Sequence, residues 1–196
     1  MPSSDPGVLQ MVTDYRSVSA DYRLFSYILL GPRYSSDVKV LVADMAERPY
    51  YSEISELLGI FEHNNEEKLL TEYTSCMVND YRELKCPPYE SWYTERTIYG
   101  RVTGKLMSIY SKYGVYPQKE LPDHVSTEME FVSFLYFVSQ DDEANDFVSN
   151  HIISWVPRLA EDITANARGD YTTLIGRSLS KFMQSERERI KMGLEP

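Results

Sequence analysis

The sequence is poor in the side chains that bind metals. Its 196 residues include two cysteines and three histidines, and these are scattered along the chain. Cys76 and Cys86 do not form a CxxC pair, so the ligand spacing of a zinc site is missing. So few cysteines are typical of a reducing compartment. We therefore predict no metal and no other cofactor, and we expect the protein in the cytoplasm.

Long apolar runs are also missing. No stretch approaches the roughly 18 consecutive apolar residues that a membrane-spanning helix needs. Residues 1–10 lack the basic segment and apolar run of a secretory signal peptide. We therefore expect no direct insertion of this chain into a membrane.

Basic residues are outnumbered by acidic ones. The chain has 20 Lys and Arg against 30 Asp and Glu, for a net charge of -10. Nucleic acid is a poor partner for such a chain, because Lys and Arg supply most of the affinity for phosphates. A basic peptide or protein surface would be attracted. Solubility alone is the other explanation of the acidic charge.

Motifs of common catalytic sites are not found. No GxSxG nucleophile motif occurs. The glycines of the segment 100–105 have the wrong spacing for a phosphate loop, and Leu106 replaces the required Ser or Thr. We interpret this segment as close helix packing of small residues. His124 is the remaining candidate for a hydrolase or nucleotide-using enzyme, but it could equally be exposed in a first helical turn capped by Asp123. We predict that the chain is not an enzyme.

What the sequence does have is helical periodicity. Apolar residues recur at i, i+3 and i+4 through most of the chain, and no pair of alternating runs is joined by a hairpin turn. This pattern predicts an all-α fold, although residues 38–46 could also form a strand. The helices are expected at 8–30, 38–46, 53–61, 66–84, 98–113, 123–140, 142–155, 157–166 and 171–191.

Prolines divide this helical pattern. Pro87 and Pro88 break it once, and a second break at 115–122 contains Pro117 and Pro122. A chain of this length forms one sizeable domain. We therefore predict a single helical domain of two sub-bundles, at about 8–114 and 123–191, joined by a proline-containing hinge at 115–122. This hinge is called the linker below. The helix at 123–140 is the most apolar and is expected to be central.

Aromatic residues gather after the first proline break. Tyr89, Trp92, Tyr93 and Tyr99 lie close in sequence to the carboxylate of Glu90. Such a loop could present aromatics to a peptide. It could also be held on the core by its aromatic rings.

Three segments resemble one protein family. Residues 87–93 read PPYESWY, residues 121–124 read LPDH and are followed by EMEFV at 128–132, and residues 151–157 read HIISWVP. In order and spacing these are similar to signatures of the TorD family of redox-enzyme maturation chaperones, which includes the DmsD and NarJ groups. The similarity spans about residues 10 to 185. Trp92 and Val132 depart from the residues usual at those positions.

The resemblance implies an all-α protein without catalysis of its own. Members bind the apo catalytic subunit of a molybdopterin oxidoreductase, often at a twin-arginine signal peptide, and assist cofactor insertion and assembly before export. A stably associated, non-catalytic subunit of such a reductase is the alternative. We expect a monomer, with a domain-swapped dimer as the other possibility. The expected client-binding residues are Tyr89, Glu90, Ser91, Trp92, Tyr93, Leu121, Asp123 and His124.

Overall fold

The fold is built from helices. The computed structural model describes residues 15–42, 45–78 and 85–194, and in this part of the chain no strand is present. The predicted all-α fold is confirmed. None of the described helices is long and apolar enough to cross a membrane.

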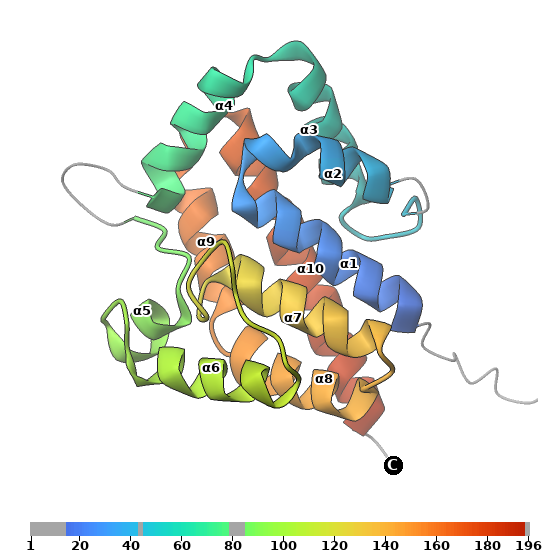
Figure 1. The fold of residues 1–196 in the computed structure, drawn as a ribbon. Helices are drawn as coiled ribbons and strands as arrows, with labels where there is room; N and C mark the ends of the chain where they lie inside the picture. Colours follow the sequence, from blue (N-terminus) through green and yellow to red (C-terminus); the bar gives the residue numbers. More distant parts are fainter. Residues whose placement is uncertain (1–14, 43–44, 79–84, 195–196) are drawn as a thin grey trace, which may run out of the picture.

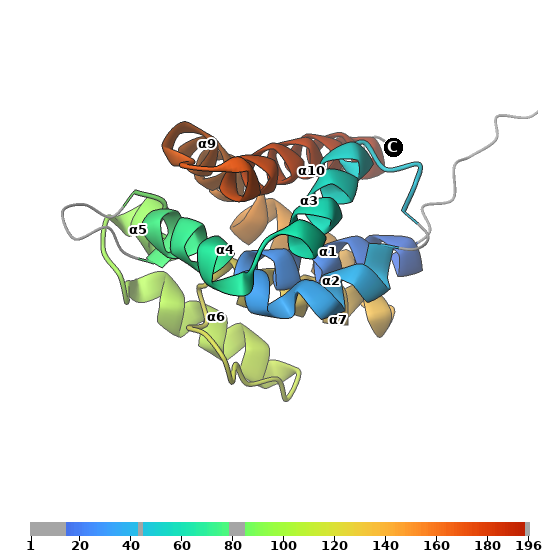
Figure 2. The same cartoon turned by 90° about the horizontal axis from the view of Figure 1, so that it is seen from above.

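Two helices far apart in sequence form the centre. α1 (Tyr15–Leu30) and α7 (Val125–Phe137) make the most extensive helix pair and lie side by side (Figure 1). Figure 2 shows α9 (Val156–Asn166) and α10 (Asp170–Leu194) as a layer on one side of this pair. α10 also packs on α3 (Tyr51–His63). Helices from both sides of the linker therefore interlock.

The remaining elements surround this centre (Figure 1). α2, α3 and α4 lie together at one end, and α5 and α6 lie together elsewhere on the surface. The elements not yet given are η1 (Pro32–Tyr34), α2 (Ser35–Leu41), α4 (Glu66–Tyr73), η3 (Thr74–Val78), α5 (Glu90–Glu95), α6 (Arg101–Lys112), α8 (Asp141–Phe147) and η4 (Val148–Ile152). η1 is a 3-10 turn, whereas η3 and η4 are π-helical turns.

One aromatic cluster joins helices that precede the linker to a helix that follows it. The ring of Phe25 on α1 stacks on Phe182 of α10 with centroids 4.4 Å apart. Tyr50, just before α3, meets both rings edge to face. All three side chains are buried. Because buried aromatic rings contribute large apolar areas, this cluster fixes α1, α3 and α10 around one core.

The central position predicted for the apolar helix is confirmed. α7 buries residues on most of its circumference, including Val125, Met129 and Val132. Its last residue, Phe137, is 78% exposed. Because the helix ends there, this side chain extends beyond the core.

Several helix ends differ from the predictions. α2 begins at Ser35, three residues before the predicted start at 38, and ends at Leu41. The helices predicted at 66–84 and 142–155 both continue as π-helical turns, η3 and η4. A π turn adds one residue to a helical turn, and an apolar period does not reveal it. The predicted stretches 8–14, 43–44 and 79–84 lie outside the described residues.

The interpretation of residues 100–105 as close helix packing holds for one of the two glycines. A side chain at Gly100 would lie 3.0 Å from the Ser91 side chain of α5 and would also collide with Glu95, whereas one at Gly104 would meet no atom within 4 Å.

The start of α6 is organised by Glu95, whose carboxylate accepts hydrogen bonds from the backbone N–H groups of Arg101 and Val102, at 2.7 and 3.1 Å. The anion-binding end of this helix is therefore filled by a side chain of the protein itself.

The cysteines are paired, which the sequence did not indicate. Cys76 and Cys86 form a disulfide, with their Cα atoms 5.4 Å apart. The Cys86 N–H also donates to the Cys76 carbonyl at 3.1 Å. Both residues are buried. Burial limits access of a reductant, because thiol–disulfide exchange requires a thiolate to reach a sulfur atom.

We expect reduction of this disulfide to lower the free energy of unfolding by about 2–3 kcal/mol, because the bond closes a short loop in the unfolded chain. Urea denaturation with and without dithiothreitol measures the difference. The double variant Cys76→Ala, Cys86→Ala is the control and should not respond to the reductant. Identical curves for the wild type in both conditions would contradict this prediction.

Candidate functional site

The segment Pro87–Tyr93, called the proline loop below, is bound to the start of α7. The Val125 N–H donates to the Pro88 carbonyl at 2.8 Å, and the Glu90 N–H donates to the Asp123 carbonyl at 2.9 Å. Between these bonds Tyr89 and His124 form an isolated antiparallel bridge. Two of the segments that carry the family resemblance therefore meet in space.

Asp123 caps a different helix from the one predicted. Its carboxylate accepts hydrogen bonds from the N–H and the hydroxyl of Ser91, in the first turn of α5. α7 is capped by His124, whose Nδ1 accepts from the Ser126 N–H at 3.2 Å. The predicted Asp123 cap of the 123–140 helix is thus wrong, because the proline loop takes this carboxylate.

His124 is buried rather than exposed in the first turn. Only 3% of its surface is accessible, and its ring lies edge-on to the Tyr89 ring at 5.3 Å. Burial lowers the pKa of His124 to about 3, so the imidazole is neutral near pH 7. A neutral ring with Nδ1 already bound to Ser126 serves to hold the helix start in place.

A buried acidic network lies next to this junction. Glu90 on α5 contacts Nδ1 of His151 at 3.0 Å, and Trp155 Nε1 donates to Glu128 at 3.2 Å. Burial raises the pKa of Glu128 well above its ordinary value, and the charge of Glu90 raises it further. Burial likewise raises the pKa of Glu90, although His151 opposes this shift. The third resembling segment, 151–157, therefore joins the other two.

Two oxygen atoms of the network are unpaired. Asp123 Oδ1 and Glu128 Oε1 are buried and have no hydrogen-bond partner. The described residues nevertheless contain no group of three or more His, Cys, Asp or Glu side chains arranged to hold a metal ion. The network is best understood as the connection between α5, α7 and the segment around η4.

The eight residues predicted to bind a client gather in one region, but burial divides them. Only three of them keep a partly exposed surface, and these are Tyr89, Trp92 and Leu121. The other five are buried, and these are Glu90, Ser91, Tyr93, Asp123 and His124. Tyr93, for example, donates its hydroxyl to Asp162 at 2.8 Å. Both readings of the loop therefore apply, since part of it packs on the core and part faces outward.

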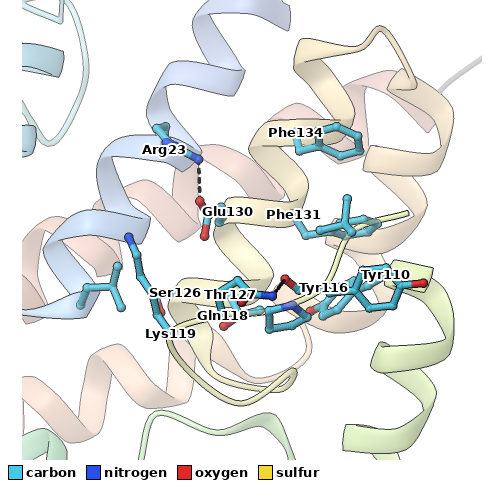
Figure 3. A pocket seen from close by; sticks show the side chains of 13 residues that line it. Arg23, Tyr110, Tyr116, Gln118, Lys119, Ser126, Thr127, Glu130, Phe131 and Phe134 are labelled. Atoms are coloured by element: carbon cyan, nitrogen blue, oxygen red, sulfur yellow. Dashed lines mark hydrogen bonds and ion pairs between the residues drawn. The ribbon is translucent and has the colours of Figure 1, made fainter. Parts of the chain in front are cut away.

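A cavity lies under the linker, on another side of the first turns of α7 (Figure 3). Its volume is about 340 Å³. It is formed by α1, the end of α6, the linker and α7. The lining residues are Arg23, Leu30, Tyr110, Val115, Tyr116, Pro117, Gln118, Lys119, Ser126, Thr127, Glu130, Phe131 and Phe134. None of the eight predicted residues is among them. We call this space the linker cavity.

The linker cavity is apolar inside and charged at one edge. Phe131 and Phe134 project from α7 toward the linker, and Arg23 of α1 pairs with Glu130 at 2.8 Å (Figure 3). Arg23 and Glu130 remain 39% and 44% exposed, so this ion pair lies at the mouth. The combination suits an apolar side chain that is close to a charged group.

The sequence held a signal for this cavity. Thr127, Glu130, Phe131 and Phe134 are spaced i, i+3, i+4 and i+7, and so share one face of α7. That face was interpreted only as core. This face of α7 stays partly open because of the path that the linker takes, and no recurrence of apolar residues in the sequence predicts that path.

Comparison with known proteins agrees with this arrangement. The model of the family described as nitrate reductase delta subunit matches residues 44–161, more than half of the chain. The fold is similar to the crystal structure of an Archaeoglobus fulgidus protein assigned as a redox enzyme maturation protein, with a TM-score of 0.64 and 22% identity. The match covers 93% of this chain and 99% of that one. No protein of curated function matches the sequence.

We expect the Glu128→Gln variant to be more stable than the wild type, by a difference in the free energy of unfolding that grows as pH rises. The folded state holds a proton on Glu128 that the unfolded chain releases near pH 4.3, so stability is lost above that pH. The variant should match the wild type near pH 4 and exceed it by at least about 1 kcal/mol at pH 8. Urea denaturation at several pH values provides the measurement.

Glu130→Gln is the matched control, since Glu130 lies on the same helix but is 44% exposed. Because this variant loses the ion pair with Arg23, it should not gain stability over the wild type at pH 8. Parallel curves for Glu128→Gln and the wild type from pH 4 to pH 8 would contradict the buried-acid interpretation.

Proposed function

Because the chain belongs to the nitrate reductase delta subunit family, which contains the NarJ- and TorD-type chaperones, we propose that it binds the apo catalytic subunit of a molybdopterin oxidoreductase. It assists cofactor insertion and assembly of that subunit before export, and acts in the cytoplasm as a non-catalytic protein. The family match over residues 44–161 is the observation that carries this proposal.

The composition of the chain supports a basic client segment. A net charge of -10 attracts a cationic peptide over a distance set by the ionic strength. A twin-arginine signal peptide has this charge. Arginine is recognised well by carboxylates and aromatic faces together.

The exposed part of the proline loop supplies candidate contacts. Trp92 and Tyr89 are partly exposed and are held by a rigid junction, so they can receive a peptide with little loss of side-chain freedom. Glu90 is buried against His151, and direct contact of its carboxylate with a client is therefore not part of the proposal.

The main test compares two forms of one client. A catalytic subunit produced without molybdopterin should bind the purified chain, whereas the cofactor-loaded enzyme should not, because its folded form no longer exposes the segment. Size-exclusion chromatography of equimolar mixtures separates these cases. If neither form binds, the chaperone proposal fails.

A second function is favoured by the family description, which calls its members a subunit. As a stably associated subunit, the chain would remain with the loaded enzyme in a fixed stoichiometry. The same chromatography distinguishes the two, since only this alternative gives a complex with the loaded enzyme.

We expect Trp92→Ala and Tyr89→Ala each to weaken binding of the apo subunit by about 1–3 kcal/mol, as for an aromatic anchor at an interface. Isothermal titration calorimetry measures the affinity, and thermal unfolding confirms that the variants are folded. Phe137→Ala is the control, because Phe137 is an exposed aromatic side chain at the end of α7. Unchanged affinity in both loop variants would remove the proline loop from the site.

A further inference from the structure

Two tyrosines beside the linker cavity hold a cation that the chain itself provides. The rings of Tyr27 on α1 and Tyr34 in η1 are stacked, with centroids 5.8 Å apart and planes 23° from parallel. The Lys119 ammonium lies 4.8 Å from the Tyr34 centroid and 5.7 Å from the Tyr27 centroid. These are the distances of cation–π contacts. Lys119 therefore attaches the linker to the surface of α1 and η1.

Lys119 is held less firmly than Arg23, the other cation at these rings. Arg23 also lies over the Tyr27 ring, at 5.1 Å, but its guanidinium is paired with Glu130. Among residues 15–42, 45–78 and 85–194, no carboxylate pairs with Lys119, and its side chain is exposed. The ammonium can leave the two rings for water without leaving a buried charge behind.

We propose that Tyr27 and Tyr34 form a binding site for an arginine side chain of a partner peptide, and that Lys119 occupies this site until the peptide arrives. The proposal rests on the function proposed above and identifies part of its binding surface. A guanidinium is planar and more weakly hydrated than an ammonium, so it stacks better on aromatic rings. An incoming arginine is therefore a stronger ligand for the pair than Lys119.

The arginine site is continuous with the linker cavity. Lys119 lines that cavity and so does Arg23, which contacts the same Tyr27 ring (Figure 3). When Lys119 leaves the rings, the linker loses a contact that holds it over Phe131 and Phe134. A bulky apolar side chain next to the arginine can then enter the cavity. The partner is thus a peptide with arginine close to large apolar residues.

The size of the effect follows from the strength of the internal contact. A cation–π contact at an exposed site favours the closed arrangement by about twofold to fivefold. The peptide binds only molecules in which the site is open, so its apparent affinity is reduced by about threefold to sixfold. Lys119→Met removes the charge but keeps the chain length. It should therefore bind the peptide about threefold to sixfold more tightly than the wild type.

The experiment measures fluorescence anisotropy of a labelled synthetic peptide that carries two arginines followed by a leucine-rich segment. A second peptide has glutamine in place of both arginines. The proteins are the full chain and its variants Lys119→Met, Tyr34→Leu and the combination of the two. Lys105→Met is the control for net charge, because Lys105 is an exposed lysine on α6.

The proposal requires three results together. Lys119→Met binds the arginine peptide more tightly than Lys105→Met does, the gain disappears in the Tyr34→Leu background, and the glutamine peptide shows no gain. A gain no larger than that of Lys105→Met would overturn it. So would a gain that persists without Tyr34, or one that is equal for both peptides.

A second measurement does not depend on the stability of any variant. In the wild type, ring currents of the two tyrosines shift the ε-CH₂ protons of Lys119 upfield in the NMR spectrum. Saturation with the arginine peptide should bring this signal to the position of an exposed lysine. An unchanged signal at saturation would show that Lys119 stays in place and would refute the exchange.

Failure of this proposal can be separated from failure of the proposed function. If the apo catalytic subunit binds the wild type and Lys119→Met equally well, the arginine site is refuted and the chaperone proposal stands. If the labelled peptide shows the Lys119 effect but no apo subunit binds, the arginine site stands and the chaperone proposal is refuted.

Discussion

The pairing of the proline loop with the start of α7 is the constraint on which the surrounding structure depends. Pro88 has no N–H to donate, but its carbonyl accepts from Val125, one of the first-turn donors of α7 that have no partner within their own helix. The Glu90 N–H, in the first turn of α5, finds its acceptor at Asp123. Each segment therefore satisfies the helix start of the other. The position of α5, the burial of His124 and the end of the linker at Pro122 all follow from this exchange.

The same junction explains why acidic side chains are buried beside it. Asp123 is stabilised at the N-terminus of α5, where free N–H groups favour negative charge. Glu128 is fully buried and lies near Glu90, and the hydrogen bond from the Trp155 indole does not offset these two effects, so its proton is retained. Replacing buried polar groups with apolar ones often costs no stability. Their role here is to specify one arrangement, since Glu90 pairs with His151 and Glu128 pairs with Trp155 only when three separate segments meet.

The sequence predicted the parts of the fold in which apolar residues recur regularly. α7 and α10 were expected because their apolar residues recur over three or more turns. The π turns η3 and η4 were not, since one extra residue leaves the flanking pattern unchanged. The capping roles of Asp123 and His124 were misassigned because both side chains can accept the same backbone donors, and the partner that decides between them is 32 residues away, at Ser91. The disulfide and the linker cavity were also not predicted, because each depends on the path of chain segments that have no regular sequence pattern.

The linker joins these features to the client binding proposed above. Tyr110 fixes both of its ends, since the Tyr110 carbonyl accepts from the Val115 N–H at 3.1 Å and the Tyr110 hydroxyl donates to the Pro122 carbonyl at 2.7 Å. Tyr110 is fully buried, so neither end can move without disturbing the core. The part of the linker that can move is therefore its middle, where Lys119 contacts the rings of Tyr27 and Tyr34. In the proposed exchange, a client changes the linker cavity while the junction of the proline loop and α7 stays intact. Such a division keeps a preformed aromatic surface beside an adjustable apolar one, which is the combination that the proposed chaperone function requires.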